Sequence, residues 1–276
     1  MKESIYFSII IPTLNEEKFL PKLLKNLKQQ KEKNFEVIIV DGQSSDKTYE
    51  NTLEFRQSFP LSFHELKKKN VSTQRNYGAR VAKGEYLIFL DADAGISPNF
   101  TYNLKKYIGR KKGLVLIPYT NPDQKDPQAK FIFKIANILT EFSQTIGKPF
   151  SRGGNMVLER HFFYRLGGFN EELYISEDHN IIQKAYDWGV RPKFLRDIKV
   201  KFSLRRMRRE GQFTYFYKYL VATGNVLIKR DIKKKIFEYE MGGGVEKVVR
   251  DKLFFKRNLK HFLKQLKQFL KQEIDI

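Results

Sequence analysis

The sequence lacks cysteine entirely, and it lacks any long apolar run. Without cysteine there is no disulfide framework, no thiolate zinc site and no cysteine nucleophile. No segment approaches the roughly 20 apolar residues needed to cross a bilayer. The start of the chain does not resemble a secretory leader, because Met1–Tyr6 carries both charge signs and the apolar run Tyr6–Pro12 is short. We therefore expect a cytoplasmic protein, either free or peripheral on the inner face of the plasma membrane.

Acidic residues are also scarce. The chain has 52 Lys and Arg against 31 Asp and Glu, a formal net charge of +21. Such a charge attracts polyanions, namely nucleic acid, anionic lipid or phosphorylated substrates. No zinc, RRM or helix-turn-helix signature is present, and the aromatic residues lie mostly in apolar runs, so we expect no nucleic-acid partner.

The first half of the chain alternates between short apolar runs and segments with helical periodicity. Strands are expected at Tyr6–Ile11, Glu36–Val40, Ser62–Leu66, Tyr86–Leu90 and Leu114–Pro118. Helices are expected at Lys18–Lys28, Thr48–Ser58, Ser72–Lys83 and Asn99–Ile108, the third with Ser72 as its cap and Gly84 as a left-handed stop. This alternation predicts an α/β fold, with a mostly parallel sheet and helices on both faces.

Polar clusters follow three of these strands: Pro12–Glu17, Asp41–Asp46 and Asp91–Asp93. Ligands of open α/β sheets bind beyond the carboxyl ends of the strands, so these clusters should share one edge. Two carboxylates one residue apart can hold a hard cation such as Mg²⁺ or Mn²⁺. Taken singly, each cluster is also compatible with a solvated turn or a helix cap, and Asp-x-Asp also occurs in aspartyl-phosphate phosphatases.

Four blocks in order make a more specific pattern. They are IIIPTLNEE at 9–17, VDGQSSDKT at 40–48, RNYGA at 75–79 and GEYLIFLDAD at 84–93. Together they resemble an inverting family-2 glycosyltransferase of the GT-A fold. The similarity continues through GGN at 153–155, GGFN at 167–170 and Glu177-Asp178, and the segment from Asp231 onward lies outside it.

The resemblance implies a nucleoside-diphosphate sugar donor and a divalent metal, Mn²⁺ or Mg²⁺, at Asp91 and Asp93. The donor-binding residues it implies are Pro12, Thr13, Asn15, Glu17, Asp41, Arg75 and Asp91. Arg205 and Arg206 stand in a basic cluster after an expected strand, and guanidinium forks match diphosphate oxygens. That cluster is equally compatible with a solvated basic loop or a polyanion-binding patch.

For the acceptor side, the resemblance implies Asp178 as the catalytic base, with Gly153, Gly154, Asn155 and Glu177 shaping the pocket for a glycan or lipid-linked acceptor. Inverting transfer needs a carboxylate to take the acceptor proton. Acidic residues in a first helical turn also favour the helix dipole without any catalysis. His179 is expected to be a surface or helix-packing residue.

We expect a GT-A-like catalytic domain at 1–230, with a nucleotide-binding half at 1–118 and an acceptor half at 119–230. Residues 231–276 form an expected basic amphipathic tail. The tail could bind an anionic membrane, pack on the body, or join a second copy in a homo-oligomer. The alternative to a transferase is a nucleic-acid- or anionic-membrane-binding protein on a non-catalytic scaffold of the same fold.

Overall fold

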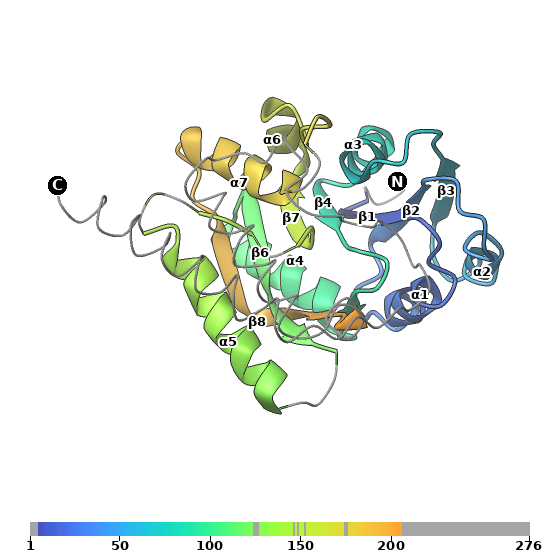
Figure 1. Ribbon diagram of the computed structural model, residues 1–276, viewed down its shortest axis with the longest axis horizontal. Coiled ribbons are helices and arrows are strands. Elements are labelled where there is room, and N and C mark those ends of the chain that lie inside the picture. Colours follow the sequence, from blue (N-terminus) through green and yellow to red (C-terminus); the bar gives the residue numbers. More distant parts are fainter. Residues whose placement is uncertain are drawn as a thin grey trace, which may run out of the picture.

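The computed structural model describes residues 5–123, 127–145, 147, 149–151, 153–173 and 176–205, so Arg206 and the expected tail at 231–276 lie outside the described residues. The strands are β1 Phe7–Thr13, β2 Phe35–Asp41, β3 Leu61–Glu65, β4 Tyr86–Phe89, β5 Gly95–Ile96, β6 Val115–Pro122, β7 Met156–Glu159 and β8 Lys193–Phe202. Over these residues they form one eight-stranded sheet, in the order β3-β2-β1-β4-β7-β6-β8-β5. Figure 1 shows this sheet running through the described body.

The sheet is parallel over its first four strands and mixed beyond them. β1 pairs in parallel with β2 and β4, and β2 with β3. β7 is antiparallel to both β4 and β6. The predicted α/β fold is confirmed, and the parallel portion coincides with the part of the sequence where strands and helices alternate.

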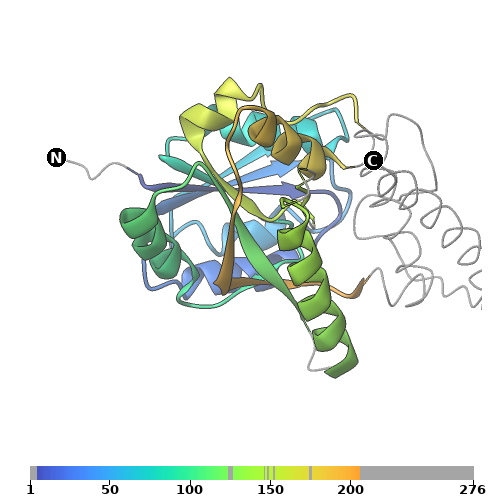
Figure 2. The same ribbon diagram turned by 90° about the vertical axis from the view of Figure 1, so that its left-hand side faces the viewer.

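Helices cover both faces of the sheet. They are α1 Leu20–Lys28, α2 Glu50–Leu53, α3 Val71–Val81, α4 Phe100–Lys111, α5 Pro127–Phe142, α6 Arg160–Arg165 and α7 Glu177–Asp187. Apolar residues of α1 and α4 belong to one core cluster, and those of α3, α6 and α7 to another. Every residue of β1 and β2 is buried, as expected for strands covered on both sides. Figures 1 and 2 show the resulting three layers.

Two details of α3, the helix that carries Arg75, differ from the sequence-based expectation. Its cap is Asn70, whose side chain accepts a hydrogen bond from the Thr73 backbone N–H, whereas Ser72 lies inside the helix and is buried. Gly84 does not have a positive φ. A Cβ at Gly84 would lie 2.5 Å from the Ser8 nitrogen, so this glycine serves close passage of the chain past β1.

Within the described ranges, no helix combines the length and the apolar character needed to cross a membrane.

Candidate active site

The loops after β1 and β2 are joined at the carboxyl edge of the sheet. Thr13 and Asp41 are register partners on the two strands, and the Thr13 hydroxyl donates to Asp41 Oδ1 over 2.8 Å. Asp41 Oδ2 accepts from the Ser44 backbone N–H at 2.7 Å. The buried Asp41 carboxylate therefore fixes the shape of its own loop and holds the first loop against the second.

The other residues expected at the donor loop tie the same two loops together. Asn15 adopts a positive φ of 54°, and its Oδ1 accepts from the Ser45 backbone N–H at 2.8 Å. Glu17 Oε2 accepts from the Lys47 backbone N–H at 3.2 Å. Pro12 is buried within β1, beside Val40 of β2. The structure thus places Pro12, Asn15 and Glu17 at the expected edge.

Arg75 is the electrostatic centre of the site. Its side chain is only 3% exposed, with Nη2 2.8 Å from Asp91 Oδ1 and Nη1 2.7 Å from Glu177 Oε1. The guanidinium also lies 5.4 Å from the centre of the Phe169 ring. Burial alone would lower the pKa of Arg75, but the Asp91 and Glu177 carboxylates outweigh it and the pKa is raised. Arg75 is therefore a fixed cation that connects the Asp-x-Asp segment to the start of α7.

A second arginine bridges two further carboxylates. Arg205 donates to both oxygens of the buried Glu16, at 2.8 and 2.7 Å, and its Nε lies 2.9 Å from Asp93 Oδ2. Its guanidinium lies 4.8 Å from the centre of the Phe19 ring. Burial raises the pKa of Glu16, Arg205 opposes this, and the charges of Asp93 and Asp91 add to the increase. Glu16, Asp91 and Asp93 therefore lie close enough to interact.

Glu16 is the residue that sequence reasoning missed. The sequence has two adjacent glutamates, and the resemblance pointed to Glu17. The left-handed turn at Asn15 directs Glu16 into the body, where its backbone N–H donates to Thr48 Oγ1 at 2.8 Å. No spacing in the sequence says which of the two carboxylates turns inward.

Asp178 lies in the first turn of α7, buried beside this network. Its Oδ1 accepts from the His179 backbone N–H at 2.9 Å. The preceding Ser176 adopts a left-handed conformation with φ of 71° and starts the helix. Burial raises the pKa of the adjacent Glu177, Arg75 opposes this, and Asp178 adds to the increase. The Glu177-Asp178 pair is thus held at one helix end, with its glutamate tied to Arg75.

The Gly153-Gly154-Asn155 segment passes directly over Arg75 and Asp91. Asn155 Oδ1 accepts from the Asp91 backbone N–H at 3.1 Å. A Cβ at Gly154 would stand 1.7 Å from Arg75 Nη2, so only glycine leaves room for the guanidinium. The structure therefore brings the expected acceptor segment, the Asp-x-Asp segment and Arg75 together.

His179 supports the chain that leads into this segment. Its Nδ1 accepts from the Ser151 backbone N–H at 3.1 Å, which places the proton of the neutral ring on Nε2. The Phe150 ring meets it edge-on at 5.6 Å, and Gln183, one turn further along α7, donates to the Pro149 carbonyl. His179 is buried, so of the two expected roles, surface residue or helix-packing residue, the first is wrong and the second agrees with the structure.

The described residues contain no group of three or more His, Cys, Asp or Glu side chains arranged to hold a metal ion. Asp91 and Asp93 nevertheless offer hard oxygen donors that are separated by one residue in the chain. Mg²⁺ and similar ions are commonly held by one or two carboxylates, with substrate phosphates and water completing the shell. The chemistry of this pair therefore fits a divalent ion that arrives with a diphosphate.

Comparison with known proteins agrees with this architecture. The TarS 1–349 crystal structure in complex with UDP-GlcNAc, from Staphylococcus aureus, superposes with a TM-score of 0.60 at 23% identity, over 81% of this chain and 67% of that one. The mannosyltransferase PcManGT from Pyrobaculum calidifontis, in complex with GDP-Man and Mn²⁺, gives a TM-score of 0.65 at 19% identity, over 84% and 66%. The fold is that of the GT-A glycosyltransferases.

The profile of Glycosyl transferase family 2 matches residues 8–167, and the chain belongs to this family. An uncharacterized glycosyltransferase of Haemophilus influenzae is 28% identical over 64% of this chain and 60% of its own length. The poly(ribitol-phosphate) beta-N-acetylglucosaminyltransferase TarS of S. aureus is 27% identical over 72% of this chain, which spans only 36% of TarS. The dolichyl N-acetyl-alpha-D-glucosaminyl phosphate 3-beta-D-2,3-diacetamido-2,3-dideoxy-beta-D-glucuronosyltransferase of Methanococcus voltae is 34% identical over 65% of this chain and 55% of its own length.

Proposed function

We propose that this protein transfers a sugar from a nucleoside-diphosphate sugar to an acceptor hydroxyl, with inversion at the anomeric carbon. The observation that carries the proposal is the double ion pair of Arg75, which joins Asp91 of the Asp-x-Asp segment to Glu177 beside Asp178. A buried bridge of this kind holds the leaving-group side and the base side of a reaction at a fixed separation. Family membership and the fold both agree with this assignment.

Asp178 is the proposed base. Its carboxylate takes the proton of the acceptor hydroxyl while that oxygen attacks the anomeric carbon, and the bond from that carbon to the diphosphate oxygen breaks. The diphosphate leaves with the electron pair of that bond. Glu177, tied to Arg75, would fix the start of α7 and so the position of Asp178.

Asp91 and Asp93 are the proposed metal ligands. A bound Mn²⁺ or Mg²⁺ would neutralise charge on the departing diphosphate. Arg205 lies against Asp93, within reach of a diphosphate held there. Arg205 and Arg206 are its proposed cationic contacts, Arg206 being outside the described residues. An Arg fork binds such oxygens in pairs.

The donor would lie along the loops after β1 and β2, in the half at 1–118, with Pro12, Thr13, Asn15, Glu17 and Asp41 near the nucleoside. The acceptor would lie against Gly153, Gly154 and Asn155, in the half at 119–230. Relatives are named for transfer to poly(ribitol-phosphate) and to a dolichyl-linked sugar phosphate. We accordingly propose a cell-envelope glycan or lipid-linked acceptor.

Donor binding can be tested apart from transfer. We expect nucleoside diphosphates to raise the melting temperature in the presence of Mn²⁺, and Asp93→Ala to remove the metal-dependent part of that rise. Asp187→Asn, on the exposed end of α7, is the control and should behave like the parent. An undiminished Mn²⁺-dependent shift in Asp93→Ala would remove Asp93 from the metal site.

The base is tested by turnover. Asp178→Asn should retain the nucleotide-dependent shift while transfer falls by at least about 100-fold, the lower end expected for loss of a general base. Asp187→Asn again serves as the control on the same helix. Transfer at the parental rate in Asp178→Asn would show that another group accepts the proton.

A further inference from the structure

Helix α5 is apolar on two opposite sides, and only one of them packs against the described body. The inner side carries Ala129 and Phe133, which cluster with Leu204, and Asn137, which is buried. The outer side carries large apolar side chains that are 42 to 63% exposed; they are Phe131, Ile135, Ile138, Leu139 and Phe142. Their spacing of three and four residues makes one continuous stripe along the helix, which we name the α5 stripe.

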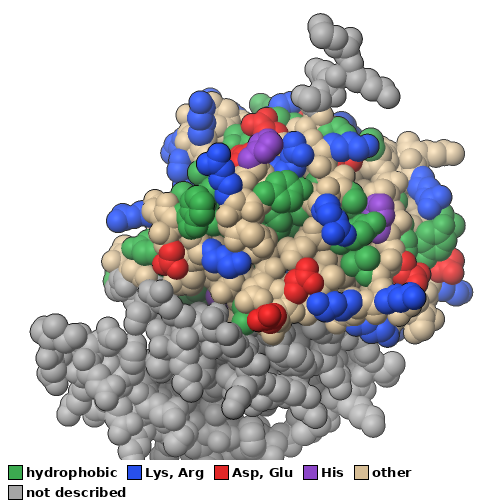
Figure 3. Space-filling model, turned by 90° about the horizontal axis from the view of Figure 1, so that it is seen from above, with side chains coloured by type: hydrophobic (Ala, Val, Ile, Leu, Met, Phe, Trp, Pro, Cys, Tyr) green, Lys and Arg blue, Asp and Glu red, His purple; other side chains and the backbone are tan. Residues whose placement is uncertain are grey.

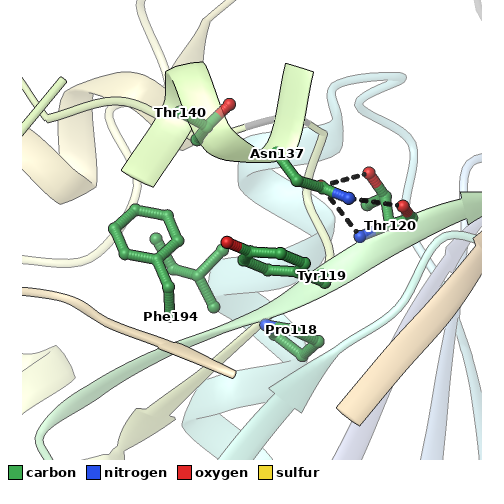
Figure 4. A pocket seen from close by; sticks show the side chains of 7 residues that line it. Pro118, Tyr119, Thr120, Asn137, Thr140 and Phe194 are labelled. Atoms are coloured by element: carbon green, nitrogen blue, oxygen red, sulfur yellow. Dashed lines mark hydrogen bonds between the residues drawn. The ribbon is translucent and has the colours of Figure 1, made fainter. Parts of the chain in front are cut away.

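The inner side is firmly anchored, so the α5 stripe cannot simply turn inward. The Asn137 amide donates to the Thr120 carbonyl at 2.8 Å and accepts from the Thr120 N–H at 3.1 Å (Figure 4). A pocket at this seam is lined by residues of β6, α5 and β8, among them Tyr119 and Phe194. Its lining contains none of the site's carboxylates, and Figures 1 and 2 both show α5 lying along β6 at the margin of the described body.

The charged residues beside the α5 stripe indicate which kind of surface would bind there. Lys130 and Lys134 are exposed and lie four residues apart along one flank. Glu141, the one acidic residue in the helix sequence, accepts hydrogen bonds from Arg196 at 3.0 and 2.9 Å. The helix thus presents an apolar surface bordered by positive charge.

We propose that the α5 stripe docks on an anionic lipid bilayer. A second copy of this chain would bring another net charge of +21 to the same border. The segment 206–276 is itself basic, with 18 Lys and Arg against eight Asp and Glu. An anionic bilayer offers both an apolar interior for the α5 stripe and negative headgroups for the flanking Lys130 and Lys134. The helix has 16 residues, so it would lie in the interface rather than cross the membrane.

Docking would place the acceptor segment close to the membrane. The chain leaves α5 at Phe142, and the Ser143 hydroxyl accepts from the Phe150 N–H at 3.3 Å, three residues before Gly153. The choice of a lipid-linked acceptor rests on the proposed function, because only a transferase has an acceptor. Membrane docking of the α5 stripe requires no donor, metal or turnover, so its test can succeed or fail independently of the test of transfer.

The absence of cysteine allows a clean fluorescence test on the full chain. Ile138→Cys, labelled with an environment-sensitive dye, should shift to shorter emission wavelength with vesicles of phosphatidylglycerol and phosphatidylcholine. The shift should be much smaller with phosphatidylcholine alone, and it should weaken at 1 M salt, where charges are screened within about 3 Å. Leu53→Cys is the control, because Leu53 is 42% exposed, against 53% for Ile138, and lies on α2, which Figure 1 shows at the far end of the body.

A matched pair of charge variants tests the energetics by vesicle sedimentation. Ile138→Glu with Leu139→Glu should weaken binding at least about tenfold, because two large apolar side chains leave the interface. Leu53→Glu with Tyr102→Glu should bind as the parent does. All four positions are exposed, so the melting temperatures should stay within a few degrees of the parent.

Three outcomes would overturn the proposal. A dye at position 138 that responds to protein concentration and not to vesicles would assign the stripe to a second copy. A dye already shielded from iodide without vesicles, and unchanged by them, would assign it to segment 206–276. Undiminished vesicle binding by the Ile138→Glu, Leu139→Glu variant would place lipid contact elsewhere on the chain.

Discussion

At Gly154 the backbone passes so close to Arg75 that a single methyl group decides whether the ion pairs form. A Cβ there would overlap Arg75 Nη2, so Gly154→Ala must displace the guanidinium from Asp91 and Glu177. Overpacking costs roughly 1–3 kcal/mol and breaking a buried pair about 3–5 kcal/mol, so we expect a clear fall in the free energy of unfolding. Denaturant titration measures it.

The matched control for this change is Gly109→Ala, in α4. Apart from its chain neighbours and the backbone of its own helix, no atom lies within 4 Å of a Cβ at Gly109, so alanine should stabilise this helix by up to about 1 kcal/mol. Equal stability of the Gly154→Ala variant and the parent would show that Arg75 moves at no cost in free energy. The ion pairs of Arg75 with Asp91 and Glu177 would then contribute little to stability.

His179 allows a second test at the same scale. His179→Phe keeps an aromatic ring in the space but leaves the buried Ser151 N–H without its acceptor, a loss worth about 1–3 kcal/mol. We expect the KM for the acceptor to rise several-fold while the KM for the donor stays constant. His179→Asn restores an acceptor oxygen near Nδ1 and should recover part of the loss. A change in the donor KM alone would contradict a role in holding residues 149–151.

Residue identity was easier to predict than residue partnership. The carboxylates Asp41, Asp91 and Asp93 were predicted at one edge because parallel strands end there together. The pairing of Arg75 with Glu177 joins positions 102 residues apart. It depends on how α3 and α7 are rotated against the sheet, and no local pattern records that rotation.

Helices and strands likewise differ in how well the sequence predicts them. The fully apolar strands β1 and β2 were predicted well, because burial on both faces leaves a strong signal. The expected helix at Thr48–Ser58 is helical only over Glu50–Leu53. Among the expected caps, Asn70 replaces Ser72, because both residue types can cap and only the backbone conformation chooses between them.

The contact between α3 and the turn at 168–171 gives a prediction about pH. Burial raises the pKa of Glu171, but hydrogen bonds from Asn76, Thr73 and Lys68 outweigh it, so the pKa is lowered. A lowered carboxyl pKa contributes stability that is present above the ordinary glutamate value and is lost as pH falls through the lowered one. Glu171→Gln should therefore cost less than about 1 kcal/mol near pH 7, because the site is partly exposed.

The difference between Glu171→Gln and the parent should disappear in acid, below the lowered pKa, and urea titrations across this range measure it. Glu172→Gln, which makes the same chemical change at the adjacent exposed glutamate, is the neighbouring control. A constant difference between Glu171→Gln and the parent at all pH values would mean that shape, and not ionisation, sets the contribution of this turn.

For the whole molecule, charge and fold give different information. The net charge of +21 is compatible with several polyanionic partners, whereas the order of the strands and the loops at their carboxyl ends indicate one ligand-binding edge, at which we propose that the nucleotide-sugar binds. On the face shown in Figure 3, Lys and Arg are spread over the surface with acidic residues among them. On this face, a spread of this kind raises solubility and long-range attraction without gathering the positive charges into one continuous strip.

The dependence on salt concentration distinguishes nonspecific binding of a polyanion from binding of a nucleotide at the candidate site. Random-sequence DNA should bind tightly only at low ionic strength. Sequence-independent binding is driven by the release of counterions from DNA, so added salt weakens it, typically to a Kd of about 10⁻⁴–10⁻⁶ M at physiological salt. Nucleoside diphosphate with Mn²⁺ should keep its thermal shift over the same salt range, because Asp91 and Asp93 lie beside buried Arg75 and partly buried Arg205, where screening is weak. Filter binding and thermal melting from 50 to 200 mM KCl test both arms. Submicromolar DNA binding at the upper end, with loss of the nucleotide response, would favour a nucleic-acid-binding protein over a transferase.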